Sequence, residues 1–273
     1  MSELNSRKIN QLLETLGDTD LVSAHWLREH GYSSSLVARY VASGWLASPA
    51  RGVYARKGGV LAWKGVLHSL QALEGLPLHA GGRYSLAWHG HEHYLRLGEA
   101  ATVTLYGPTR LPGWVPKLEL PERFVHCGKG PFDLPPLPFG PTLSDDELYE
   151  HGLEQEADTS LSASVILASN ERAMLELCDA APDAALVYEL DALMQGLAGL
   201  RPDLLSRLLR HCRSVKAKRL FLALAERHAH PWFARLALES VSLGSGKRVL
   251  VRGGRLHPKY HITLPEDLDA HLG

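Results

Sequence analysis

The sequence predicts an α+β fold in two parts: an N-terminal winged helix-turn-helix domain followed by a larger mixed α+β domain. Three observations support this prediction. A chain of 273 residues is long for a single domain. Residues 1–58 contain the signals for helix, short strand, helix, tight turn, helix and basic hairpin, in that order. Residues 93–273 mix strand-like runs, Pro- and Gly-rich connections and amphipathic helices. We therefore expect the first domain to span residues 1–92, with its core in 1–58, and the second to span 93–273.

The first two helices are predicted by an apolar stripe and by capping residues. Asn5 or Ser6 is a suitable N-cap for the first helix, and Gly17 is expected to end it. A short extended piece, TDLVS, follows, after which Ser23 caps a second helix, AHWLREH, that stops at Gly31. The stripe of the first helix has the i, i+3, i+4, i+7 spacing of one helical face. Its members are Ile9, Leu12, Leu13 and Leu16.

The third helix is predicted between Ser33, a good N-cap, and Gly44. Its apolar residues gather on one side, which leaves small and polar residues on the other. The apolar residues are Leu36, Val37, Tyr40 and Val41. Two short strands should follow around a Ser48-Pro49 turn, with basic residues on the second strand. This pair of strands would form the wing.

A helix with a small, polar outer face can lie deep in a DNA major groove, which is about 12 Å wide. A basic wing beside it can contact the adjacent phosphates. We therefore expect double-stranded DNA as a partner. Winged helices also serve as protein-binding modules, and each residue alone could be a solvated surface group. The candidate DNA-contacting residues are Ser33, Ser34, Ser35, Arg39, Arg51, Arg56 and Lys57.

The remaining elements are predicted from periodicity, caps and turn residues. A helix over 60–76 should complete the N-terminal domain, and LHAGGRYSLAWHG is typical of a turn and a short helix. YLRL is expected to enter a strand. Ser169 and Pro202 suit the first turns of two helices, and Gly253-Gly254 is a strong hairpin signal between two extended runs. Strands are expected at 101–107, 122–128 and 162–169, and helices at 170–180, 185–200, 201–212 and 214–228.

Charge is distributed unevenly, although the net charge is only −1. Residues 140–203 carry 2 Lys or Arg against 14 Asp or Glu, whereas residues 204–261 carry 13 against 2. Such asymmetry favours a basic surface in the last quarter that meets a polyanion, or that docks on the chain's own acidic segment. We expect two elements to present it, a helix and a strand. The residues are Lys216, Lys218, Arg219, Arg227, Lys247, Arg248, Arg252, Arg255 and Lys259.

The spacing of the cysteines and the hydropathy of the chain indicate the cellular compartment of the protein. Cys127, Cys178 and Cys212 are far apart and lack CxxC spacing, which argues for a reducing compartment and against a metal cage. The N-terminus has no signal-peptide pattern, and the longest apolar stretch, 220–225, is far too short to span a bilayer. We expect a cytoplasmic protein that has no membrane partner.

Patterns that would indicate an enzyme fail on inspection. His89, His91 and His93 recur at every second position, but they straddle an expected helix-to-strand corner without a supporting Cys or HExxH pattern. The GSGKR stretch at 244–248 misses two positions of a phosphate loop. Cys127 is next to His126, but strand neighbours point to opposite faces. We therefore predict no catalytic residues, no metal, no cofactor and no small-molecule substrate.

Taken together, the chain resembles AbiEi-type antitoxins, the regulatory half of AbiE abortive-infection toxin–antitoxin pairs. The matching stretches include SSSLVARYVASGWLASPARGVYARKGG, SNERAMLELCDAAP, LALAERHAHPWF and GSGKRVLVRGGRLHPKYHITLP, in the family's order and over nearly the whole chain. The resemblance implies an N-terminal domain that binds an operator and represses its own operon. It also implies a C-terminal domain that counters a nucleotidyltransferase-like toxin, in a type IV arrangement without obligatory contact. Direct binding of the toxin, its chemical modification and a solitary regulator remain open, and the basic C-terminal surface could contact DNA, RNA or protein.

Overall fold

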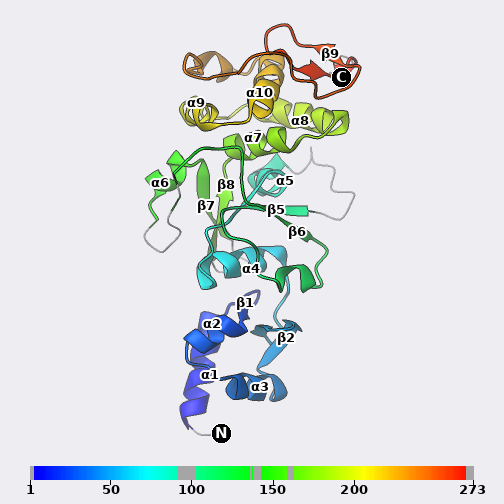
Figure 1. Cartoon of the computed structure of the whole chain (residues 1–273). Coiled ribbons are helices and arrows are strands. Elements are labelled where there is room, and N and C mark those ends of the chain that lie inside the picture. Colours follow the sequence, from blue (N-terminus) through cyan, green and yellow to red (C-terminus); the bar gives the residue numbers. More distant parts are fainter. Residues whose placement is uncertain (1–2, 92–101, 136, 138–142, 159–162, 269–273) are drawn as a thin grey trace.

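A computed structural model describes residues 3–91, 102–135, 137, 143–158 and 163–268. The elements stack along one long axis in three tiers (Figure 1). The N-terminal helices and wing form one end, a mixed sheet lies in the middle, and a layer of helices with the C-terminal segment forms the other end. The chain is therefore a mixed α+β structure with an N-terminal domain and a larger second part, as the sequence predicts.

The N-terminal domain has the predicted order of elements. Its three strands form an antiparallel sheet in the order β1-β3-β2, which is the arrangement of a winged helix. Ser23 caps α2 and Ser33 caps α3, as expected. Leu12, Leu27 and Tyr40 are fully buried in the core between the helices and this sheet. The elements are α1 (Glu3–Thr15), β1 (Leu21–Ser23), α2 (Ala24–Glu29), α3 (Ser34–Ala42), β2 (Leu46–Ala50) and β3 (Val53–Arg56).

Two local predictions in this domain are wrong. Helix α1 begins at Glu3, so neither Asn5 nor Ser6 is its N-cap. Ser48-Pro49 lies within β2, and the chain reverses at Arg51 and Gly52. A register shift in β2 accommodates the proline, and Ser48 Oγ donates to the carbonyl oxygens of Ala50 in the same strand and Val53 in β3. Gly52 has a φ of +80°, which a glycine adopts without strain.

The helix expected over 60–76 is shared between the two parts of the molecule. It consists of α4 (Trp63–His68) and a π-helical turn, η1 (Ser69–Leu73). On one side, Ser69 Oγ accepts a hydrogen bond of 2.7 Å from the Leu21 N–H of β1. On the other side, Leu67 packs in the cluster that contains the central strands of the sheet. This helix therefore does not belong to the N-terminal domain alone, and the boundary after residue 92 remains a prediction.

The middle tier is a five-stranded sheet in the order β6-β5-β4-β8-β7. The β5–β6 and β4–β8 pairs are parallel and the other two pairs are antiparallel. Strands β5, β6 and β8 confirm the prediction, whereas β4 was expected to be a turn and β7 was not expected. The strands are β4 (His79–Gly81), β5 (Thr102–Tyr106), β6 (Arg123–Cys127), β7 (Leu153–Asp158) and β8 (Ala163–Ala168), with the short helices α5 (Arg83–Leu86), η2 (Ala87–His91), η4 (Val115–Lys117) and α6 (Asp145–Glu150).

The third tier is helical and confirms the predicted helices. Ser169 Oγ caps the first of them, and Pro202 lies in the first turn of the third. Leu190, Leu205 and Phe221 are completely buried in the core that these helices share. The helices are α7 (Asn170–Ala180), α8 (Ala184–Gly196), α9 (Pro202–His211) and α10 (Val215–His228), followed by the short η5 (Phe233–Arg235).

The C-terminal segment differs from the expected hairpin. The antiparallel pair is β9 (Arg255–Leu256) with β10 (Thr263–Leu264), so the chain reverses over 257–262 and not at Gly253-Gly254. A Cβ on Gly254 would lie 2.3 Å from the Leu264 carbonyl oxygen, so this glycine permits a close backbone approach. Backbone amides before the pair are held by Thr263 Oγ1 instead of a strand partner.

Candidate nucleic-acid interface

Helix α3 presents a small-residue face at one end of the molecule. Leu36, Val37 and Tyr40 anchor its inner side in the core. Ser33 Oγ accepts a hydrogen bond from the Leu36 N–H at 3.3 Å and starts the helix. The outer face is exposed, and Figure 1 places α3 at the end opposite the C-terminal helices. Its residues are Ser34, Ser35, Ala38, Arg39, Ala42 and Ser43.

The wing residues are exposed beside this helix. Arg51 lies at the turn between β2 and β3, and Lys57 follows the end of β3. Arg56 is exposed but paired, because its Nη1 lies 3.2 Å from Asp18 Oδ1. Arg39 and Arg51 make no side-chain hydrogen bond or ion pair with any residue that the structure describes. All seven predicted DNA-contacting residues are exposed on the N-terminal domain, and Arg39, Arg51 and Lys57 are the cations among them without a side-chain partner in the described residues.

Trp45 is a candidate contact that the sequence analysis missed. It directly precedes β2, and 40% of its surface is exposed. Its backbone is fixed, since its N–H donates to the Tyr40 carbonyl and its own carbonyl accepts from the Lys57 N–H. An exposed indole between α3 and the wing can pack on a sugar or a methyl group. The sequence signal was a large aromatic residue directly after Gly44, outside every apolar stripe.

The predicted basic surface of the C-terminal part is only partly correct. Lys218 and Arg219 are buried, and Lys216 Nζ donates to the Ala181 carbonyl oxygen at 2.9 Å. Arg227 is largely buried and pairs with Asp191 at 3.2 Å. These four are structural because α10 is covered by neighbouring helices and by the C-terminal segment. The residues that are exposed are Lys247, Arg248, Arg252, Arg255 and Lys259.

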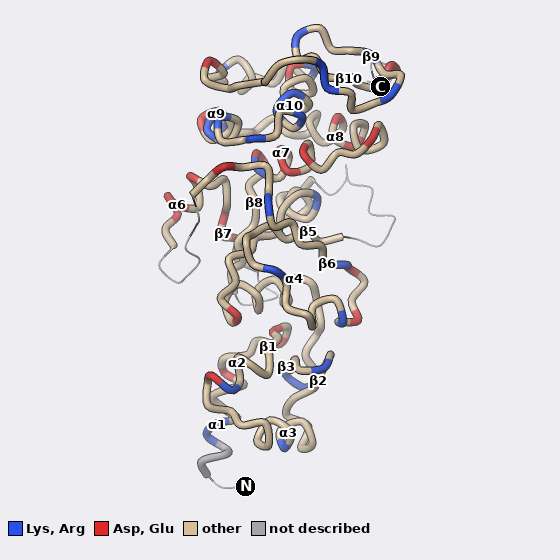
Figure 2. The backbone as a smooth tube through the Cα atoms, viewed as in Figure 1, with Lys and Arg blue, Asp and Glu red and all other residues tan. Residues whose placement is uncertain are grey.

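The exposed cations lie in the C-terminal segment, and two of them are not in the secondary structure that the sequence predicted. Arg248 and Arg252 are in a loop and not along a strand; Arg248 makes a single bridge to Ile262. Lys259 is paired with Glu226 at 2.5 Å. Figure 2 shows blue Lys and Arg positions on these C-terminal loops and red acidic positions on α6 and α8. Some basic residues of the last quarter of the chain therefore pair with acidic residues in the folded structure, although the two kinds of charge are separated along the sequence.

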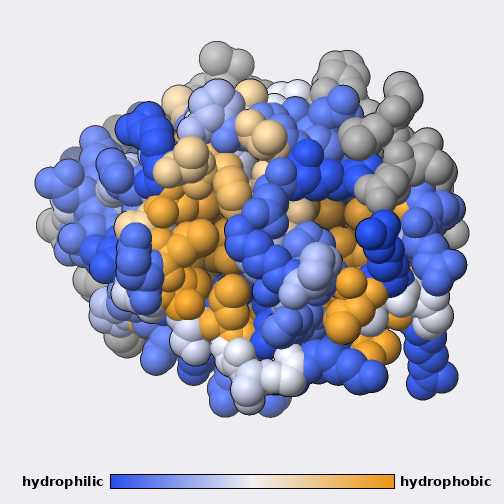
Figure 3. Space-filling model, turned by 90° about the horizontal axis from the view of Figure 1, so that it is seen from above, coloured by the Kyte–Doolittle hydropathy of each residue, from blue (hydrophilic) through white to orange (hydrophobic). Residues whose placement is uncertain are grey.

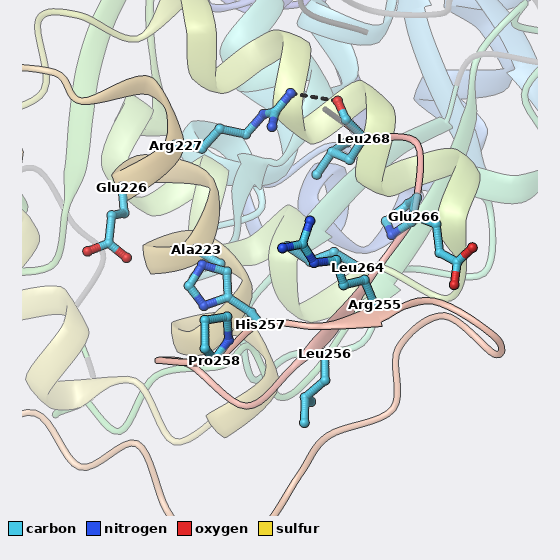
Figure 4. Close-up of a pocket in the computed structure, with 11 residues that line it drawn as sticks. Ala223, Glu226, Arg227, Arg255, Leu256, His257, Pro258, Leu264, Glu266 and Leu268 are labelled. Atoms are coloured by element: carbon cyan, nitrogen blue, oxygen red, sulfur yellow. Dashed lines mark hydrogen bonds between the residues drawn. The ribbon is translucent and has the colours of Figure 1, made fainter. Parts of the chain in front are cut away.

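A pocket of about 360 Å³ lies between α10 and the β9–β10 pair. Figure 4 shows Arg227 reaching the Leu268 carbonyl oxygen, with a hydrogen bond of 2.5 Å, while Arg255 and Glu266 lie on the strand side. Its remaining walls are largely apolar, including Leu256 and Leu264. Opposite charges are present on its rim, so it has no strong preference for an anion.

The histidine cluster occupies a corner between helix and sheet. His89 Nε2 lies 3.1 Å from the Ala168 carbonyl oxygen, and His93 lies outside the described residues. Within the described ranges, the metal-capable set is His89, Glu154 and Glu156, with ligand atoms within 4.8 Å of one another. Glu154 is already engaged by Arg201 at 2.6 Å. A cation would have to displace these contacts, and the absence of a metal remains a prediction.

The other catalytic patterns acquire structural roles. His126 Nε2 lies 2.9 Å from the Gly107 carbonyl oxygen, while Cys127 Sγ donates to the Lys129 carbonyl, so the two neighbours do not pair. Burial raises the pKa of the Cys127 thiol, which disfavours the nucleophilic thiolate. In the GSGKR stretch, the carbonyls of Gly244 and Gly246 accept hydrogen bonds from Arg219, so this turn anchors a buried guanidinium.

Comparisons with known proteins agree with this architecture. A family model described as "Transcriptional regulator, AbiEi antitoxin, Type IV TA system" matches residues 100–265. The chain belongs to the AbiEi antitoxin family. A second model, for the AbiEi antitoxin N-terminal domain, matches residues 5–97, so the resemblance read from the sequence is confirmed. The AbiEi family is one of antitoxins and transcriptional regulators and not of enzymes.

The fold is also found in a solved structure. The crystal structure of the RV2827C protein from Mycobacterium tuberculosis is similar to this AbiEi chain with a TM-score of 0.55 and 16% sequence identity. The similarity covers 97% of this chain and 93% of the other. At this identity the likeness concerns the fold alone. A search of curated proteins found no match. Among the described residues, no helix has the length and apolar character needed to cross a membrane.

Proposed function

We propose that the N-terminal domain binds operator DNA and represses the chain's own operon, with α3 in the major groove and the wing on the phosphates. The C-terminal part neutralises a nucleotidyltransferase-like toxin. The observation that supports the first role best is the exposed small-residue face of α3, with Arg39 on this helix and Arg51 on the wing both exposed and unpaired among the described residues. Small side chains allow close approach to base edges, and the two arginines can bind bases or phosphates.

The separation of the two ends supports a division of labour. Figure 1 places α3 at one end and the exposed cations of 247–259 at the other, beyond the sheet and the helical layer. We therefore assign operator binding to the N-terminal end and toxin neutralisation to the opposite end.

The test is a paired substitution in the full chain. Arg39→Ala with Arg51→Ala should abolish specific binding to the chain's own promoter, because each lost phosphate contact lowers the log–log salt slope by about 0.9 and each lost base contact costs about 1–3 kcal/mol. Arg110→Ala with Arg123→Ala, two exposed arginines in the middle tier, is the matched control. Fluorescence anisotropy over a salt series measures both quantities. Unchanged promoter binding by the first pair would refute the assignment of the interface.

Direct contact with the toxin is a second candidate function of the C-terminal part. Val249 and Leu256 are 58% and 44% exposed, and Lys247, Arg248 and Arg252 lie around them in sequence. Figure 3, which views the molecule from this end, shows apolar side chains gathered among hydrophilic ones. An apolar centre with a charged rim is the usual anatomy of a protein interface.

Co-elution separates direct contact from neutralisation without contact. If the C-terminal segment binds the toxin, the pair should co-elute on gel filtration at micromolar concentration. Val249→Asp with Leu256→Asp should then remove the complex, while Val60→Asp, an equally exposed position outside the C-terminal segment, should not. Neutralisation in cells without co-elution would favour the indirect, type IV arrangement.

A further inference from the structure

A second cavity, of about 380 Å³, opens at one edge of the central sheet. It lies where the parallel strands β5 and β6 end, beside the start of β4, and it is bordered by the loops Gly107-Pro108 and Gly128-Lys129-Gly130. The carboxyl ends of parallel strands are a frequent place for ligand sites, because the loops there converge without obstruction from side chains of the sheet. Its volume falls within the range of small-molecule sites.

The polar lining of this cavity is cationic. Lys129, Arg172 and Arg213 line it together with His79 and His151, and no lining residue is Asp or Glu. Arg213 has one weak acidic neighbour, Asp133 at 3.7 Å, and both side chains are exposed. The Lys129 side chain makes no hydrogen bond or ion pair with any described residue and is exposed. An anion would therefore meet two exposed cations, Lys129 and Arg213, and the largely buried Arg172.

Arg172 is held in a fixed orientation in that wall. Its Nε donates to Glu176 Oε1 at 2.8 Å and its Nη1 donates to the His151 carbonyl at 2.6 Å, while Nη2 has no partner among the described residues. The guanidinium also lies over the Phe132 ring, with its carbon 4.7 Å from the ring centroid. These contacts orient the free end of the guanidinium before any ligand arrives.

A buried polar cluster makes the wall rigid. Glu176 Oε1 is 3.0 Å from His79 Nε2 as well as bonded to Arg172, and the His79 ring is stacked on Tyr106 at 5.5 Å. His79, Glu176 and Tyr106 are all buried. The Tyr106 hydroxyl has no hydrogen-bond partner among the described residues, so it is a further donor that borders the cavity. The rest of the lining is largely apolar and includes Pro77, Pro108 and Pro135.

We propose that this cavity binds a small organic phosphate of nucleotide size. Its phosphate would contact Lys129 and Arg213 at the mouth and Arg172 within, and its remaining part would pack against the proline- and leucine-lined wall. This site is independent of the DNA interface, because it uses the middle tier and not the N-terminal domain. It goes beyond the sequence prediction, which expected no cofactor and no small-molecule substrate.

The test is titration calorimetry of the full chain with pyrophosphate, AMP and ATP. AMP or ATP should saturate one site per chain, and Lys129→Gln with Arg213→Gln should weaken that binding by about tenfold or more, the expected loss for charged contacts to a phosphate. Both side chains are exposed, so the variant should keep its fold, which a thermal melt checks. Lys117→Gln with Arg123→Gln, exposed cations of the same tier, is the control and should bind like the unmodified chain.

Two results would overturn the proposal. One is the absence of saturable binding of both AMP and ATP at millimolar concentration, whether or not pyrophosphate binds. The other is equal affinity in the Lys129/Arg213 variant and the unmodified chain. Promoter binding, measured in parallel, should be the same for both variants, so failure of this site is distinguishable from failure of the operator role.

Discussion

Arg219 provides a sharp test of the structure, because its sequence context indicated a surface cation and its position is buried. Only 2% of the residue is exposed. Its guanidinium donates to the carbonyl oxygens of Leu243 at 2.8 Å, Gly244 at 3.0 Å and Gly246 at 2.5 Å, and it also reaches His261. It therefore joins α10 to both ends of the C-terminal segment. Arg219→Met keeps most of the side-chain stem and removes all four hydrogen bonds.

Arg219→Met should remove a large fraction of the free energy of unfolding of a typical domain. Each hydrogen bond from a charged donor contributes about 1.5–3 kcal/mol, but the freed carbonyls can partly rehydrate because they belong to a surface segment. We expect Arg219→Met to lower the free energy of unfolding by about 3–5 kcal/mol, because four carbonyl oxygens lose a charged hydrogen-bond donor. Exposed Arg252→Met should change it by less than about 0.5 kcal/mol.

Urea denaturation measures the loss, and hydrogen exchange over 243–262 locates it. The variant should lose amide protection in this segment before the helical core unfolds. A loss below about 1 kcal/mol with unchanged protection would refute the structural role of Arg219. The guanidinium would then have to be available to a partner, as the sequence alone suggested.

Three further predictions follow from single contacts. Gly65→Ala should destabilise the chain by about 1–3 kcal/mol, because a Cβ at this position would lie 2.1 Å from the Thr19 carbonyl oxygen. This clash should outweigh the preference of a helix for alanine over glycine, which is about 1 kcal/mol. A rise in melting temperature would contradict this prediction. Burial would raise the pKa of Glu171, but hydrogen bonds from Arg201 and its charge hold it below the ordinary value of 4.5. The contribution of ionised Glu171 to the free energy of unfolding is therefore complete above pH 4.5 and is lost as the pH falls below that value. Glu171→Gln should make the stability of the chain less dependent on pH in the acid range. An unchanged pH dependence would count against the Glu171–Arg201 pair. Trp45→Ala should weaken promoter binding while leaving the melting temperature within a few degrees, and equal affinity would remove Trp45 from the interface.

The N-terminal domain was the part of the fold that the sequence specified best. Its helices have local signals, Ser23 and Ser33 as caps and a one-sided apolar stripe, and local signals are sufficient where tertiary contacts agree with them. The same holds for Ser169 and Pro202 in the helical tier. The seven candidate DNA residues are all exposed, but their role in binding DNA remains a prediction.

The failures concern features that depend on contacts distant in sequence. The three-residue strand β4 contains Gly81, and only its pairing with β5 and β8 makes it a strand. Strand β7 was missed because it is a charged edge strand without a clear apolar period. The buried positions of Lys218 and Arg219 could not be predicted, because lysine and arginine are normally exposed. Only the folded structure shows which parts of the chain cover them. The cationic cavity is assembled from strand ends and α7, which no single stretch of sequence brings together.

The central claim is that α3 and the wing read operator DNA. Its most direct measurement is the affinity of the full chain for its own promoter and for a scrambled duplex of equal length, at several salt concentrations. If α3 and the wing read operator DNA, the promoter should bind about 10³-fold or more tightly than the scrambled duplex at physiological salt, and the affinity should fall steeply as the salt concentration rises. Equal affinities for the two duplexes at every salt concentration would contradict it.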